Sequence, residues 1–237
     1  VYVRQAKIGN PDLKPATSTN SNFGFIFSDD IQKFTLDYWK IDFEDRIVLQ
    51  SPQALLGQDP NGSSITRNDI GDLIGITTTY FNEESTMVSG IDFEYKRFFD
   101  LKNYGELDFT IRGTNLIEFL TPDRNDITCL ALDCLQLIDR VGKFNFDAHT
   151  HALPENRINT FINWKFNNYI FGINTRYIDG YKNNKTIPQS AIDRGYSNEV
   201  DSSFLFDLSV DLPLSDLFTI NTADGDYELK TNFAIIN

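Results

Sequence analysis

The two histidines of the chain, His149 and His151, stand one residue apart in the segment DAHTHALPE. In a strand this spacing puts both imidazoles on the same face, and Asp147 and Glu155 lie close by in the sequence. Such a cluster could bind a metal ion or help a surface loop to hold a metal chelate. The pattern fixes no third ligand, so an exposed polar loop is the competing interpretation. We therefore expect no resident metal and no cofactor.

Two cysteines form a second candidate pair, Cys129 and Cys134 in the segment NDITCLALDC. A Cys-x4-Cys pair is weak evidence for zinc when it has neither a second cysteine pair nor histidines at ligand spacing. A small loop disulfide formed in an oxidising compartment explains the pair, and so do two reduced, half-buried thiols. The sequence leaves both interpretations open and makes this pair a candidate disulfide.

Catalytic motifs are not evident elsewhere in the chain. No Ser-His-Asp order, glycine-rich phosphate loop or paired carboxylates stand out among the scattered acids, so we expect no enzyme. Two cations are more informative, because Arg112 and Arg176 fall on the polar side of alternating segments. Both are candidate ligand-binding residues, as cations that could meet an anionic ligand.

The elements that must position these residues are strands. Aromatic residues are frequent, with 20 Phe and 10 Tyr, which favours strands over helices. The nearest approach to a helical pattern is 130–140, which predicts a turn or two of helix within a loop. Eight segments alternate apolar and polar residues with a period of two, and these are 23–27, 34–38, 91–95, 107–111, 158–166, 169–177, 204–212 and 227–235.

The connections and the charge narrow the fold class. Short turns at 28–32, 98–105 and 167–168 alternate with long segments at 48–86, 120–156 and 182–202, which an antiparallel meander would place at opposite ends. A net charge of −13 disfavours nucleic acid as a partner. The sequence contains no run of 18 apolar residues, so it predicts no transmembrane helix. A membrane β-barrel remains possible, because its strands alternate apolar and polar residues instead of forming long apolar runs.

Alternation does not say whether the apolar face meets lipid or a protein core. Tyr and Trp near strand ends, and a mixed ionic opposite face, favour a membrane barrel with aromatic girdles and a wet lumen. A secreted soluble β-sandwich or barrel that binds a ligand is the alternative. In LDYWKIDFEDRIV the apolar phase shifts after Tyr38, which predicts either a bulge or an exit from the membrane.

Several segments, in order along the chain, resemble one family. GNPDLKPATSTNSNFGF resembles the proline-marked entry to a mid-barrel strand of TonB-dependent outer-membrane receptors, although Ala16 replaces the usual Glu. FTLDYWKIDFEDRIV is similar to the ascending strand that follows in the family, and VSGIDFEYKRFF is similar to a later strand. ALPENRINTFINWKF resembles the strand entry after a cysteine-bearing loop.

The resemblance implies an all-β, antiparallel up-and-down meander that forms part of a barrel of about 22 strands, with about 8 present and the barrel not closed by this chain. Residues 1–237 would be a partial barrel domain without the plug domain and the final strands. The implied function is uptake of a scarce nutrient (siderophore-iron, cobalamin or a saccharide) in the outer membrane of a Gram-negative bacterium. The implied partners are the TonB complex, the nutrient, and outer-membrane lipid and lipopolysaccharide, and Arg112 and Arg176 could also meet plug carboxylates.

Overall fold

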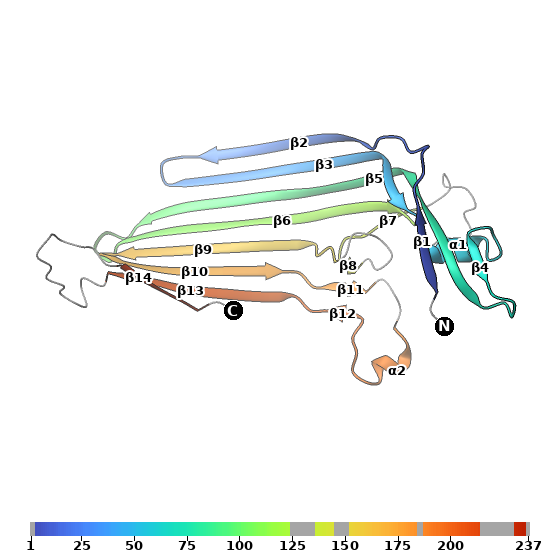
Figure 1. Ribbon diagram of the computed structural model, residues 1–237. Helices are drawn as coiled ribbons and strands as arrows, with labels where there is room; N and C mark the ends of the chain where they lie inside the picture. Colours follow the sequence, from blue (N-terminus) through green and yellow to red (C-terminus); the bar gives the residue numbers. More distant parts are fainter. Residues whose placement is uncertain (1–2, 124–135, 145–151, 184–186, 214–229, 236–237) are drawn as a thin grey trace, which may run out of the picture.

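The computed structural model describes residues 3–123, 136–144, 152–183, 187–213 and 230–235 of the 237-residue chain. Strands predominate and the helices are short (Figure 1). In chain order the elements are β1 (Arg4–Ile8), β2 (Thr17–Ser28), β3 (Gln32–Leu49), α1 (Pro52–Gln58), β4 (Ile65–Arg67), β5 (Leu73–Asp100), the 3-10 helix η1 (Lys102–Tyr104), β6 (Glu106–Pro122), β7 (Leu137–Asp139), β8 (Lys143–Phe144), β9 (Asn156–Phe166), β10 (Tyr169–Ile178), β11 (Tyr181–Asn183), α2 (Gln189–Ile192), β12 (Glu199–Val200), β13 (Ser203–Pro213) and β14 (Lys230–Ile235).

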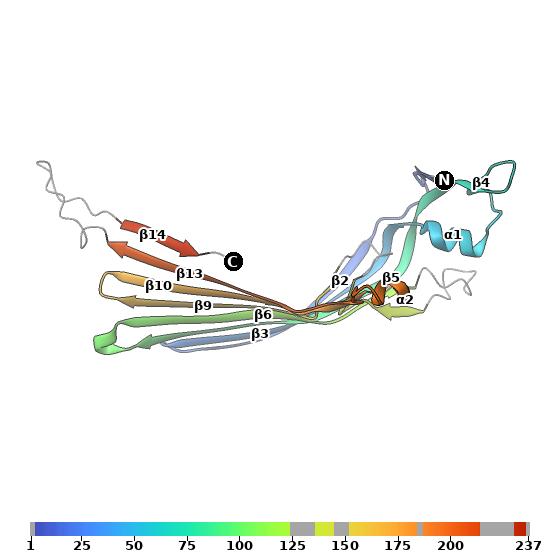
Figure 2. The same ribbon diagram turned by 90° about the horizontal axis from the view of Figure 1, so that it is seen from below.

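Eight of these strands lie side by side in one sheet, in the order β14-β13-β10-β9-β6-β5-β3-β2 (Figure 1). Each is antiparallel to its neighbours in this order. They correspond to the eight segments that alternation predicts, so the antiparallel meander is confirmed. Within the described part of the chain the sheet bends without closing, and the edge strands β2 and β14 do not meet (Figure 2).

Short turns gather at one end of the sheet, which we call the turn end. In the β2–β3 turn, Asp29 Oδ1 accepts hydrogen bonds from the backbone N–H groups of Ile31 and Gln32, both at 2.9 Å. The β9–β10 turn needs a left-handed residue, and Asn167 supplies it with a φ of 52°. One connection departs from the predicted division, because the paired residues Pro213 and Lys230 place both ends of segment 214–229 at the turn end.

Alternation gives the sheet two unlike faces. Phe171 of β10 is paired with Trp164 of β9 and Val210 of β13, and all three are apolar. The next residue of β10 is paired with Asn163 and Ser209. The register therefore collects apolar side chains on one surface, the apolar face, and charged or amide side chains on the other, the polar face.

β3 and β5 are the longest strands, with 18 and 28 residues, and the sheet bends along them (Figure 2). The two faces change character part of the way along β3. Tyr38 ends the apolar series and is followed on its own face by Lys40 and Asp42, whose Nζ and Oδ1 are 3.2 Å apart. Trp39 and Phe43 lie on the opposite face, which is polar nearer the turn end. The apolar band of this strand therefore ends at Tyr38.

The change of phase is not a bulge in β3. That strand pairs with β2 and with β5 in constant register through the change. The bulge lies in β6, where Ser89 of β5 is opposite Glu118 but Gly90 is opposite Leu116, so that Ile117 is an extra residue. The sequence allowed two explanations for the change of phase, a bulge or an exit from the membrane. The constant register of β3 rules out the bulge.

A buried ion pair joins β3 to β5 beyond the end of the apolar band. Glu83 is 3 % exposed, and its Oε2 accepts hydrogen bonds from Arg46 Nη2 at 2.8 Å and Arg46 Nε at 3.2 Å. Thr86 Oγ1 donates to the same oxygen at 3.2 Å. A buried carboxylate is stable only when it is paired and hydrogen-bonded, and these donors meet that condition.

Two predictions about the long segments are corrected. The helix predicted for 130–140 is wrong in its described part, because 137–139 form β7 and pair with β6 at 120–122. β6 extends beyond the residues that pair with β9, so part of its edge is free to form backbone hydrogen bonds. Pairing with this edge determines the conformation of 137–139 more strongly than the helix-like spacing of apolar residues does. Segment 48–86 is only partly a connection, since β3 reaches Leu49 and β5 begins at Leu73.

The loop end, opposite the turn end, contains elements that alternation does not predict. β1 pairs in parallel with β5 at Gly75–Thr79, along the edge that β3 leaves where Leu49 pairs with Tyr80. The proline-marked segment then crosses towards β2, with the Lys14 backbone donating to and accepting from the side chain of Asn82. A second sheet has the order β12-β11-β8.

Helices have a minor place in the fold. Among the residues that the structure describes, none forms a helix with the length and apolar composition needed to cross a membrane.

Candidate functional site

The polar face brings the two candidate arginines together. Arg112 of β6 and Arg176 of β10 are both directly opposite Asn159 of β9, and Glu94 of β5 is opposite Arg112. We call these four residues the arginine row. Neighbouring strands lie about 4.8 Å apart, so the two arginine backbones are separated by roughly 10 Å. The chain separates them by a long connection, and the sheet register makes them second neighbours.

The two arginines differ in their partners. Arg112 lies over the ring of Phe161, with its guanidinium carbon 5.0 Å from the ring centroid, and it forms no ion pair in the described part of the chain. Arg176 Nη2 is 3.3 Å from Asp207 Oδ2, and Asn174 Nδ2 donates to the same oxygen at 3.2 Å. The charge of Arg176 is therefore partly neutralised, whereas a ring face supports Arg112 and leaves its N–H groups for another partner.

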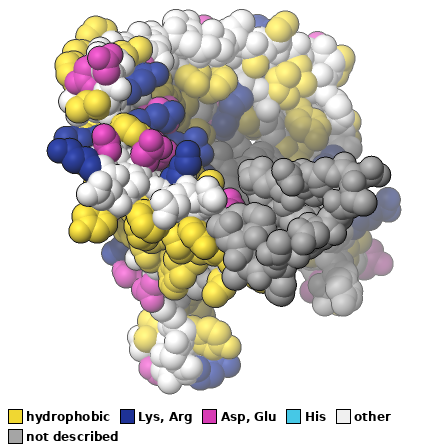
Figure 3. Space-filling model, turned by 90° about the vertical axis from the view of Figure 1, so that its left-hand side faces the viewer, with side chains coloured by type: hydrophobic (Ala, Val, Ile, Leu, Met, Phe, Trp, Pro, Cys, Tyr) yellow, Lys and Arg dark blue, Asp and Glu magenta, His cyan; other side chains and the backbone are white. Residues whose placement is uncertain are grey.

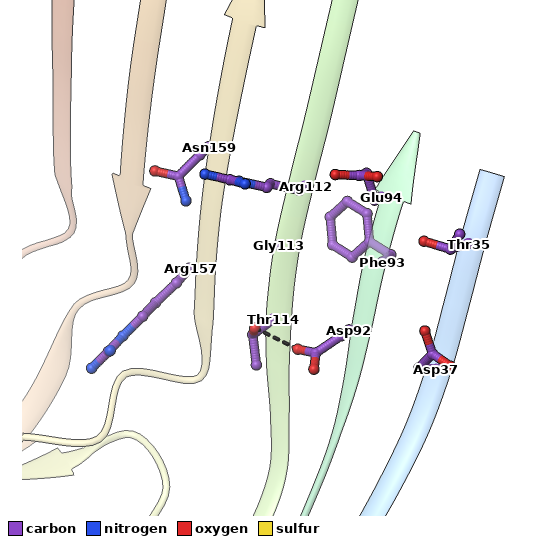
Figure 4. Close-up of a pocket in the computed structure, with 10 residues that line it drawn as sticks. All are labelled: Thr35, Asp37, Asp92, Phe93, Glu94, Arg112, Gly113, Thr114, Arg157 and Asn159. Carbon is purple, nitrogen blue, oxygen red and sulfur yellow. Dashed lines mark hydrogen bonds between the residues drawn. The ribbon is translucent and has the colours of Figure 1, made fainter. Parts of the chain in front are cut away.

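A groove of about 540 Å³ crosses the polar face beside this row. Asp37, Asp92 and Glu94 lie on its β3–β5 side, and Arg112 and Arg157 lie on its β6–β9 side (Figure 4). The groove is therefore acidic towards one wall and basic towards the other. Such a surface can bind a partner that carries both signs of charge, or guide an anion along its basic side.

Local contacts fix several of the groove side chains. Thr114 Oγ1 donates to Asp92 Oδ1 at 2.6 Å, and this bond joins β6 to β5 (Figure 4). Arg112 extends towards Asn159 in the same view, while Arg157 points away from them. Charged groups of both signs also lie next to one another at the turn end, with hydrophobic side chains in separate groups (Figure 3).

The site is wider than the sequence predicted. Asp37, Asp92, Glu94 and Arg157 are recognisable as polar-face residues, but nothing in the sequence sets them beside Arg112. For Asp37 and Arg157 the missing information is register, because long segments join β3 to β5 and β6 to β9 and do not determine how those strands align. β5 and β6 are joined by a short turn, so the positions of Asp92 and Glu94 opposite β6 depend on the geometry of that turn.

A tight cluster closes the loop end of β9 and β10. Asp179 accepts hydrogen bonds from Tyr177 Oη at 2.6 Å, Asn156 Nδ2 at 2.6 Å and Asn156 N at 2.9 Å. Burial opposes ionisation of Asp179, but these donors together hold its pKa below the ordinary value. The ionised carboxylate therefore pins the start of β9 to the end of β10.

The remaining predicted site residues lie outside the described residues. These are His149 and His151, and the candidate disulfide of Cys129 and Cys134. Within the described ranges, no group of three or more His, Cys, Asp or Glu side chains is placed to bind a metal ion.

Comparison with known proteins shows the family. Residues 2–226 match the family model described as TonB dependent receptor-like, beta-barrel. The chain therefore belongs to the TonB-dependent receptors and forms part of their β-barrel, as the resemblance implied. No curated protein matches the chain.

Solved structures of similar fold agree with this assignment. A ferric enterobactin receptor mutant from Pseudomonas aeruginosa is 16% identical, with a TM-score of 0.52 over 86% of this chain and 24% of its own. The siderophore receptor PirA from Acinetobacter baumannii is 18% identical, with a TM-score of 0.52 over 89% and 27%. The FrpB iron transporter from Neisseria meningitidis is 11% identical, with a TM-score of 0.52 over 86% and 25%. The chain thus spans about a quarter of the length of these proteins.

Proposed function

We propose that this chain forms part of the barrel wall of a receptor that imports a scarce nutrient across the outer membrane of a Gram-negative bacterium. The observation that carries the proposal is a family match over 2–226 on a sheet with one apolar and one ionic face. In a membrane barrel the apolar face meets lipid and the polar face lines the lumen. The protein works by binding and gated passage, with no bond chemistry.

In this proposal, other parts of the receptor complete the barrel and couple it to an energy source. A plug domain and further strands come from outside residues 1–237, and energy comes from the TonB complex through the plug region. Lipid and lipopolysaccharide surround the apolar face. We further propose that His149 and His151 contribute to ligand capture and that Cys129 and Cys134 form a disulfide.

We assign the arginine row to the ligand path. Arg112 has its cation supported by Phe161 and directed into an open groove, which suits an anionic ligand or a carboxylate of the plug. Two proteins of similar structure are a ferric enterobactin receptor and a siderophore receptor, and an anionic iron chelate is the nutrient that fits the basic wall best. Cobalamin and saccharides would gain less binding free energy from a cation at the position of Arg112.

Uptake by the receptor that carries this chain tests the proposal. It is expressed in a bacterium without other receptors, and transport of radioactive iron supplied as ferric enterobactin is followed with and without TonB. Losing one charged contact weakens binding about 10- to 100-fold, so we expect Arg112→Gln to raise KM for uptake by that factor. Lys33→Gln, a charge removal on the same face near the turn end, is the matched control and should leave uptake unchanged.

Two results would contradict the proposal at different levels. Uptake that persists without TonB would refute energised transport. A receptor that is soluble and monomeric without detergent would refute the membrane barrel and support the secreted ligand-binding module instead.

A further inference from the structure

Arg97 is a cation on the apolar face of the sheet. Along β5 it follows Phe93 and Tyr95 with the same parity, and Phe99 comes two residues later. Its direct neighbours across the sheet are Gln32 of β3 and Phe109 of β6. β5 ends three residues beyond Arg97, so the charge lies close to the turn end.

The structure supplies little compensation for this charge. The guanidinium carbon lies 4.8 Å from the centroid of the Phe99 ring. Arg97 Nε is buried and has no hydrogen-bond partner among the described residues. In the same part of the chain, no carboxylate lies within ion-pair distance of its guanidinium. Two ordinary ways to compensate a half-buried cation, an ion pair and a hydrogen bond, are therefore both unused within the described part of the chain.

Asp29, an acid whose charge interacts with Arg97, is already hydrogen-bonded to other groups. Asp29 accepts from Gln32 Nε2 at 3.0 Å and from the N–H groups of Ile31 and Gln32. The pKa of Asp29 is lowered chiefly by the Gln32 side chain, and Arg97 contributes only a weaker attraction at longer range. The Gln32 side chain is engaged as well, because its Oε1 accepts from Tyr95 Oη at 3.0 Å. Polar neighbours thus leave the guanidinium without a direct partner.

Aromatic residues mark the depth of this position. Trp164 Nε1 donates to the Tyr104 carbonyl oxygen at 2.7 Å, and the Trp164 ring stacks on Phe166 and Phe171. These residues form an aromatic girdle at the turn end, and Arg97 lies one same-face residue further from that end, because Trp164 is in the row of Phe99. On its other side Arg97 adjoins the β2–β3 turn, since its partner Gln32 is the first residue of β3. Strands tilted by about 45° make a row of paired residues slope through the membrane, so Arg97 lies at the turn level while Ile173, three strands away in the same row, lies four residues from its strand end. A long cationic side chain at that depth extends its charge towards the headgroups.

From this geometry we propose that Arg97 binds the phosphodiester of a phospholipid in the leaflet at the turn end. The proposal rests on the proposed function, since it requires the apolar face to lie in lipid. A guanidinium forms two parallel hydrogen bonds to a phosphate, and the bond is strong where water is scarce. The acyl chains of the same phospholipid would cover Phe93 and Tyr95, which lie on the same face of β5 as Arg97. The headgroup and the acyl chains would therefore contact one continuous part of the apolar face.

The test uses native mass spectrometry of the whole receptor, purified in a detergent without phosphate and titrated with phosphatidylglycerol. We expect Arg97→Gln to weaken binding of the first lipid about tenfold, the change typical of one charge-assisted contact. Lys33→Gln removes a charge at similar depth from the polar face and should leave lipid binding unchanged. Inorganic phosphate, added as a competitor, should not displace the lipid.

The outcomes separate this inference from the proposed function. Equal lipid retention by Arg97→Gln and the unmutated receptor, in a detergent-dependent protein, would overturn the inference alone. Displacement by inorganic phosphate would overturn the lipid as the occupant. A receptor that needs no detergent would overturn the proposed function, which the inference presupposes.

Discussion

A lysine at the centre of the apolar face should strongly destabilise the receptor in a bilayer. Ile173 is the fifth residue of β10, is 40 % exposed, and has Ile162 and Leu208 directly opposite on the neighbouring strands. Four steps of about 3.3 Å, on a strand tilted by about 45°, place it roughly 9 Å from the girdle at Tyr169. Half of an apolar band of about 25 Å is about 12 Å, so Ile173 is close to the midplane.

A lysine at that depth costs about 2–4 kcal/mol, whereas one in the lumen costs little. The matched control is Asn174→Lys, one residue further on and on the polar face. There the new ammonium would meet Asp207, which already accepts from Asn174 Nδ2. We expect Asn174→Lys to change the free energy of unfolding by less than about 1 kcal/mol.

The assay is reversible urea unfolding of the whole receptor in lipid vesicles, followed by tryptophan fluorescence. Ile173→Lys should lower the free energy of unfolding by at least about 1 kcal/mol more than Asn174→Lys does. Equal costs, or a greater cost at Asn174, would refute the assignment of the two faces.

Three further predictions concern turns, buried charge and pH. Gly105 has a φ of 91° and the backbone of β9 lies where a Cβ would be, so Gly105→Ala should cost about 1–3 kcal/mol in the same titration. Arg46→Met leaves Glu83 buried without its cation and should cost about 3–5 kcal/mol, an effect that adding Glu83→Gln should largely reverse. The pKa of Asp179 is lowered from 3.8, so its stabilising contribution is complete above that value and is lost as pH falls through the lowered pKa. The protection factor of the Asn156 amide against hydrogen exchange should fall in that range, and Asp179→Asn should abolish this fall.

Strand existence was predictable because each strand has one apolar face. Alternation in 158–166 and 169–177 requires no information from outside the segment, and both strands form as expected. β1 and β12 were not predictable, since segments of five and two residues contain too little pattern. β1 forms along the edge of β5 that β3 leaves open, and β12 pairs with the short strand β11 in the second sheet. Pairing with these strands, rather than local preference, determines them.

The candidate site was predictable only in part. Parity along β6 and β10 correctly predicts that Arg112 and Arg176 lie on the polar face. It does not predict that both lie opposite Asn159, because that alignment depends on strand pairing across long connections. The change of phase after Tyr38 was visible in the sequence, but only the constant register of β3 distinguishes the end of an apolar band from a bulge.

The central claim is that the apolar face lies in lipid and the polar face in water. Spin labels placed one at a time along 169–178 of the whole receptor in vesicles test it most directly, by collision with oxygen and with a water-soluble nickel chelate. The account predicts a period of two, with oxygen accessibility highest at Phe171, Ile173 and Thr175 and nickel accessibility highest between them. Uniform accessibility, or the opposite phase, would contradict it.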